Sequence, residues 1–132
     1  MLKLILHVKN EAVENISEQL LKKFVLQSLK KRNVTNQVII DIFIVKSEII
    51  RKLNYKYRNY NKPTAVLSFP TTIGKAKQKI PFKTGQKIPS LLGDIIICPE
   101  VVRKETPDKQ LTNAINILID HSISHLLGYH HK

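Results

Sequence analysis

Gly93-Asp94-Ile95-Ile96-Ile97-Cys98 is a segment that is apolar almost throughout. A short apolar run predicts a strand, and its lack of alternation predicts a central position in a sheet. Residues 2–8 and 37–45 are also expected to be strands, the second because apolar and β-branched residues alternate along it. Residues 65–69 are expected to form a further short strand.

Helical spacing of apolar side chains is clear over residues 16–32. Asn15 and Glu18 are predicted to cap the start of this helix. Ser47 is predicted to cap a second helix over residues 48–58.

The last helix is predicted to start at Thr106-Pro107-Asp108, where a capping hydroxyl, a proline and an acidic residue follow one another. It is expected to run to about Leu127 and to end at Gly128. The predicted order β-α-β-α-β-β-α indicates an α/β fold, or α+β sandwich. One mixed sheet of about four strands would pack against helices, with the candidate site at the end of the C-terminal helix.

The composition is typical of a soluble globular protein, with 42% hydrophobic and 24% charged residues. A length of 132 residues predicts one domain over residues 1–132. No apolar run is long enough to span a bilayer, and no cleavage site of small residues follows residues 2–8, so we expect a cytoplasmic protein. The single cysteine, Cys98, is expected to be a buried, inert thiol in a reducing compartment.

Lysine and arginine outnumber acidic residues by 22 to 10, which gives a formal charge of +12. This field attracts polyanions, so the expected partner is nucleic acid and not a membrane; a lysine-rich proteome is the alternative explanation. Residues 71–90 are predicted to be a loop without acidic residues. Its lysines are interpreted as RNA-phosphate contacts or, equally, as part of a solvated loop: Lys75, Lys77, Lys79, Lys83 and Lys87.

Four of the five histidines fall within residues 121–131. His121 and His125 are one helical turn apart, which places their Cβ atoms on one face about 5–6 Å apart. Gly128 lets the chain turn back, so that His130 or His131 can reach the same point. Three imidazoles would hold one divalent ion per chain, with Zn²⁺ as the expected metal, and leave a position for water, as catalytic sites do.

A histidine pair at helical spacing is also common on helix surfaces that bind no metal, and a terminal His-His-Lys can be an added tag. A peptidase of the H-E-x-x-H type is disfavoured, because Ser122 stands where those enzymes carry their general base.

Three blocks of sequence carry a family resemblance. They are His121-x3-His125-x5-His131; Leu53-Asn54-Tyr55-Lys56-Tyr57-Arg58 with the following residues 63–70; and Leu92-Gly93-Asp94-Ile95. In their order along the chain, these blocks resemble those of the YbeY family, metal-dependent endoribonucleases that act in the maturation of bacterial ribosomal RNA.

The resemblance implies an α/β fold in which His121, His125 and His131 hold zinc and Arg58 lies near the metal. A guanidinium in that place would bind a phosphodiester through two hydrogen bonds and stabilise the charge of the transition state. Without the resemblance, Arg58 would be interpreted as a solvated residue at a helix end. Asp94 is expected to orient a ligand or the neighbouring loop, or to have a purely structural role.

Four features depart from the family pattern. Ala65 and His130 replace aspartates, Ser122 replaces the usual glycine, and relatives usually continue beyond Lys132 into an acidic segment. The loss of two carboxylates near the site predicts reduced activity. His130 is expected to be able to compete with His131 for the ion.

We therefore expect an endoribonuclease that hydrolyses single-stranded RNA with a metal-activated water, in ribosomal RNA maturation and ribosome quality control. Its partners would be ribosomal RNA or ribosomal particles. The alternative is a non-catalytic module that binds RNA or the ribosome and carries a structural metal. A zinc hydrolase of another substrate class is disfavoured by Ser122 and by the charge. The RNA target, the physiological metal and the oligomeric state are not predicted.

Overall fold

The computed structural model describes residues 2–70 and 90–128. Its strands are β1 (Lys3–Asn10), β2 (Gln37–Ile44), β3 (Val66–Pro70) and β4 (Ser90–Ile97). They form one sheet of order β1-β2-β4-β3, in which β1, β2 and β4 are parallel and β3 runs antiparallel beside β4. The predicted mixed sheet is confirmed, and β4 has the predicted internal position.

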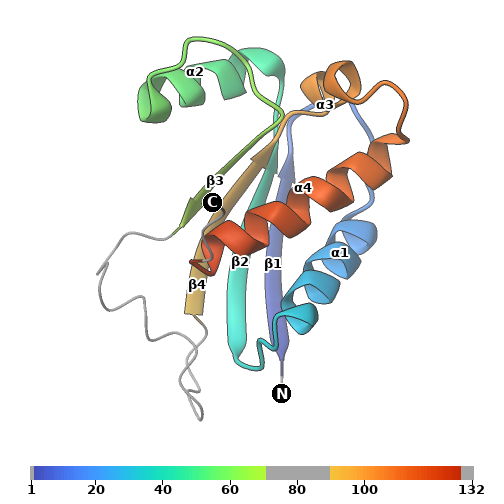
Figure 1. Ribbon diagram of the computed structural model, residues 1–132, viewed down its shortest axis with the longest axis vertical. Coiled ribbons are helices and arrows are strands. Elements are labelled where there is room, and N and C mark those ends of the chain that lie inside the picture. The colour runs from blue at the N-terminus through green and yellow to red at the C-terminus, as the bar shows by residue number, and fades with distance from the viewer. Residues whose placement is uncertain (1, 71–89, 129–132) are drawn as a thin grey trace.

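The helices of the described residues are α1 (Glu18–Lys31), α2 (Ser47–Arg58), α3 (Pro99–Glu105) and α4 (Leu111–Leu126). Figure 1 shows α1 and α4 side by side across one face of the sheet, whereas α2 and α3 lie at the end where β2 and β4 finish. None of the helices in residues 2–70 and 90–128 is both long and apolar enough to cross a bilayer.

The core lies between the sheet and the pair α1 and α4. Alternate residues of β2 are fully buried, as the period of two in a strand requires: Val38, Ile40, Ile42 and Ile44. The helices contribute fully buried residues at helical spacing: Leu21, Val25 and Leu29 from α1, and Ile119 and Ile123 from α4. Cys98 is 0% exposed, which confirms its predicted burial. Burial raises the pKa of its thiol.

Two predicted helix caps are wrong by one or two positions. Ser17, and not Asn15, caps α1, because its Oγ accepts a hydrogen bond from the Leu20 amide at 3.2 Å. Ser47 is already helical, and Lys46 holds the N-cap position of α2 without a side-chain hydrogen bond. Several polar residues near each helix start can serve as a cap, and local sequence does not decide among them.

The predicted start of the last helix at Thr106 is also wrong. Residues 99–105 form the separate helix α3, and the Thr106 hydroxyl donates to the Val102 carbonyl at 2.6 Å. The hydroxyl therefore serves the end of α3 and does not cap α4, which begins only at Leu111 after Gln110.

Gly93 brings β3 and β4 into close contact. Its φ is +144°, and a Cβ there would lie 2.2 Å from the backbone oxygen of Phe69. We expect Gly93→Ala to lower the free energy of unfolding by about 3 kcal/mol, because strand backbone cannot move aside as a side chain can. Urea denaturation measures the loss. Gly128→Ala, with φ +89° but no atom within 4 Å of the added Cβ, should lose less; equal losses would contradict the steric explanation.

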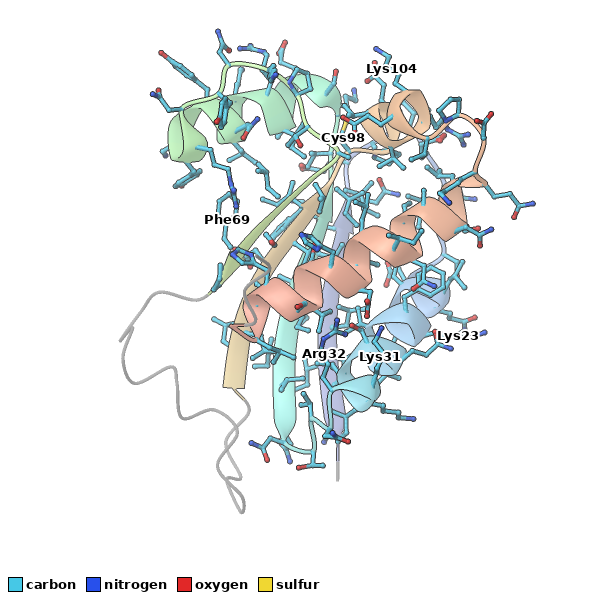
Figure 2. All side chains as sticks on the ribbon, in the orientation of Figure 1. Lys23, Lys31, Arg32, Phe69, Cys98 and Lys104 are labelled. Atoms are coloured by element: carbon cyan, nitrogen blue, oxygen red, sulfur yellow. The ribbon has the colours of Figure 1, made fainter. Side chains whose placement is uncertain are left out.

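A polar cluster joins α4 to α1. The Asp120 carboxylate accepts hydrogen bonds from Ser28 Oγ at 2.7 Å, Lys31 Nζ at 3.0 Å and Arg32 Nη1 at 2.7 Å. Figure 2 shows Lys31 and Arg32 on the side of α1 that faces α4. Hydrogen bonds from Arg32 above all hold the pKa of Asp120 well below its usual range. The cluster fixes how α4 is rotated about its axis, because Asp120 must face α1.

Asp120→Asn is expected to lower stability at neutral pH by about 2 kcal/mol, a value reduced for the partial exposure of the carboxylate. Since the pKa is lower in the folded state, this stability is present above the unfolded-state pKa near 4 and is lost as pH falls. Urea denaturation of both proteins at several pH values should therefore show a difference that narrows in acid. A difference that stays constant would contradict the ionic explanation.

Candidate functional site

A cavity of about 610 Å³ opens between α2, β3 and α4. His121 and His125 of α4 line it, together with Arg58 from the end of α2 and Ser68 from β3. The consecutive elements α2 and β3 therefore meet the distant helix α4 at this cavity. It contains every described residue that was predicted to bind the metal or to act in catalysis.

The two histidines project from one side of α4, as their four-residue spacing predicts. His121 is exposed, whereas His125 is half-buried and its Nδ1 lies 2.7 Å from Ser68 Oγ. A partner on one ring nitrogen fixes the ring of a metal-binding histidine and directs the other nitrogen to the ion. Sequence reasoning gave Ser68 no role, because its proximity to His125 depends on how α4 packs against β3.

Arg58 reaches the cavity because the chain turns sharply after α2. Asn59 has φ +64°, and its amide donates to the Tyr55 carbonyl at 3.0 Å, which ends the helix. The buried Asn54 donates from Nδ2 to the Lys62 carbonyl at 2.9 Å and holds the returning chain. Arg58 and Lys62 both line the cavity, so two positive charges face a space that also contains two histidines.

Glu105, at the end of α3, also lines the cavity. It is the carboxylate among the described lining residues, and sequence reasoning missed it because α3 was not predicted. Ser122, which replaces the family's glycine, lies between the two histidines and is 1% exposed. The described lining of the cavity therefore includes one carboxylate.

Asp94 lies outside the cavity lining. Its partners in register are Asp41 on β2 and Phe69 on β3, and Asp41 in turn contacts Nδ1 of His7 at 2.9 Å. Burial, and then the charge of Asp41, raise the pKa of Asp94. Both predicted roles of Asp94, orienting a ligand or the neighbouring loop and a purely structural one, stay predictions.

His130, His131 and the lysines of residues 75–87 lie outside the described residues. Within residues 2–70 and 90–128, no three histidine, cysteine or acidic side chains are arranged to hold a metal ion. Metal binding by His121 and His125 stays a prediction, and His131 stays the predicted third ligand.

Comparison with known proteins shows a family match over nearly the whole chain. The sequence pattern of the family "Endoribonuclease YbeY" matches residues 5–132. An "Endoribonuclease YbeY" from Buchnera aphidicola is 38% identical over 123 residues, which are 90% of this chain and 71% of that protein. The protein of the same name from Legionella pneumophila is 36% identical over 108 residues, 80% of this chain and 63% of that protein.

The solution structure of TM1509 from Thermotoga maritima has the same fold. Its TM-score is 0.57 at 23% sequence identity, and the match covers 100% of this chain and 75% of that chain. The predicted α/β class is therefore confirmed both by the described strands and by a solved structure.

Proposed function

Because this chain belongs to the YbeY endoribonuclease family, we propose that it is an endoribonuclease that hydrolyses phosphodiesters of single-stranded RNA. Ribosomal RNA, or a ribosomal particle in the cytoplasm, is the proposed target, in RNA maturation and ribosome quality control. The observation that carries the proposal is that His121, His125 and Arg58 line one cavity.

We propose that zinc is held by His121, His125 and His131. The first two fit this role, because they lie one turn apart on α4 beside the same cavity and Ser68 positions the ring of His125. Nitrogen donors of this kind suit zinc. When bound, the ion would supply Lewis acidity and lower the pKa of water toward about 7.

Arg58 would bind the scissile phosphodiester, since its guanidinium can donate two parallel hydrogen bonds to phosphate oxygens. Lys62 would add charge on the same side of the cavity. Glu105 would accept a proton from the attacking water, because a carboxylate in the cavity can take up protons in the way that general bases do. The lysines of residues 75–87 are proposed to contact RNA phosphates further from the site.

Metal removal tests this function. The chain is treated with EDTA, assayed for cleavage of an end-labelled single-stranded RNA, and assayed again after Zn²⁺ is restored. Cleavage that disappears and returns supports the proposal, and a duplex RNA should be cut far more slowly. RNA binding without cleavage at any metal content would support the alternative, a binding module with a structural metal.

A further inference from the structure

Three of the four tyrosines fall within residues 55–60. Their exposed fractions are 55% for Tyr55, 58% for Tyr57 and 62% for Tyr60. Tyrosine is enriched at interfaces, because its ring offers a large rigid surface and its hydroxyl stays in water. Three exposed rings in one short segment, of which Tyr60 lines the cavity, indicate a binding surface. The side on which each ring lies decides which of them belong to it.

Helical geometry places Tyr55 and Tyr57 on two different sides of α2. Arg51, Tyr55 and Arg58 are spaced i, i+4 and i+7, which aligns them in one stripe. Arg58 lines the cavity, so this stripe borders it. Tyr57 lies off the stripe, and its ring packs on Phe69 with centroids 5.1 Å apart.

The turn after α2 adds Tyr60 and Lys62 to the same side. Both line the cavity with Arg58. Arg51 Nη1 donates to Asn61 Oδ1 at 2.6 Å, so the stripe and the turn are joined directly. The surface called the α2 face below consists of Arg51, Tyr55, Arg58, Tyr60 and Lys62.

The α2 face combines aromatic rings with positive charges, which is the chemistry of a single-strand binding site. Aromatic rings stack on unpaired bases, and the cations contact the phosphates between them. A duplex keeps its bases stacked inside the helix, so its phosphates can contact the cations but its bases cannot stack on the tyrosine rings. The combination favours a single strand over a duplex and over an acidic protein.

We propose that the α2 face is a stacking platform for single-stranded RNA, with bases on Tyr55 and Tyr60 and the adjoining backbone directed into the cavity. The inference rests on the proposed RNA substrate and assigns the selection of single strands to named residues. The distance between platform and histidines is spanned by the cavity itself, since Tyr60 and His125 both line it.

Equilibrium binding of a short fluorescein-labelled single-stranded RNA tests the platform by fluorescence anisotropy. The full chain is used as purified and again with EDTA, which prevents any cleavage. Tyr55→Leu and Tyr60→Leu should each weaken binding about 5- to 100-fold, the loss of one stacked base, whereas Tyr55→Phe and Tyr60→Phe should stay close to the original affinity. Binding of the matching duplex should change little.

Tyr57→Leu is the matched control, because its ring is engaged with Phe69 on another side of α2. It should bind single-stranded RNA as the original chain does. The chain contains no tryptophan, so its intrinsic fluorescence comes from tyrosine. Bases that stack on the tyrosine rings should quench this emission. If a variant with both Tyr55→Leu and Tyr60→Leu bound single-stranded RNA with unchanged affinity, the platform would be overturned. Losses of affinity in the phenylalanine variants as large as those in the leucine variants would also overturn it.

The outcomes separate this inference from the proposed function. Ring-dependent binding without cleavage would support the platform and contradict the nuclease. Metal-dependent cleavage with unchanged binding in both leucine variants would support the nuclease and overturn the platform. If the chain bound single-stranded and duplex RNA equally well, the platform would also be overturned. The exposed rings would then be better explained as a contact surface for a protein.

Discussion

His125→Ala is expected to slow cleavage of single-stranded RNA by about a thousandfold and to remove most of the bound zinc. His125 is half-buried, and Ser68 Oγ lies 2.7 Å from its Nδ1, so its ring is held against β3. Alanine would leave too few ligands for a stable site, and the loss of the metal removes several kcal/mol of transition-state stabilisation. Zinc per chain and initial cleavage rates are the measurements.

His7→Ala is the matched control. His7 is exposed on β1, bonded to Asp41, and absent from the cavity lining. Its loss should leave zinc content and rate unchanged. A His125→Ala protein that keeps both its zinc and its rate would contradict the proposed site. If His125→Ala loses zinc because the protein unfolds, Ser68→Ala is measured in its place. This variant keeps all three proposed ligands and should bind zinc more weakly.

The strands could be predicted from sequence because their pattern is local. Residues 37–45 alternate, and alternate residues of β2 are buried. The apolar run at residues 93–97 is part of the internal strand β4, and Cys98 follows it as the N-cap of α3. The helix boundary at Thr106 could not be predicted. Its hydroxyl satisfies the Val102 carbonyl, and only the presence of α3 makes that acceptor available. A capping residue can serve either of two neighbouring helices, and the choice is a tertiary one.

The candidate site was predictable where residues share one element or one motif. His121 and His125 lie one turn apart, and the family resemblance added Arg58, which lines the same cavity. Ser68 and Glu105 were missed, since each reaches the cavity through the packing of β3 or α3 against α4. The position of Asp94 beside Asp41 likewise follows from the pairing of β2 with β4 and could not be predicted from the sequence motif.

The rotation of α4 connects stability with the site. Asp120 faces α1 through its hydrogen bonds with Arg32 and Lys31. Successive residues of a helix are turned by about 100°, so fixing Asp120 toward α1 turns His121 away from it, toward the cavity. The polar cluster therefore positions the side of α4 that carries His121 and His125, although Asp120 does not line the cavity. If these histidines bind zinc as proposed, loss of the cluster should reduce zinc affinity as well as stability.

Arg58→Gln is expected to lower kcat for single-stranded RNA by about 10²- to 10³-fold, with zinc content and stability unchanged. The side chain is exposed and lines the cavity, so its removal leaves no buried gap. The expected size is that of losing one donor to a developing negative charge. Arg58→Lys should recover only part of the rate, because an ammonium cannot make two parallel hydrogen bonds to a phosphate.

Lys23→Gln removes the same charge from the exposed side of α1 and serves as the control for the overall field. It should slightly raise KM at low salt and leave kcat unchanged. If Arg58→Gln raised KM alone, the guanidinium would hold substrate and transition state equally and would have no catalytic role. A fall in kcat that exceeds any change in KM is the result that the proposed role requires, because only an interaction strengthened in the transition state accelerates the chemical step.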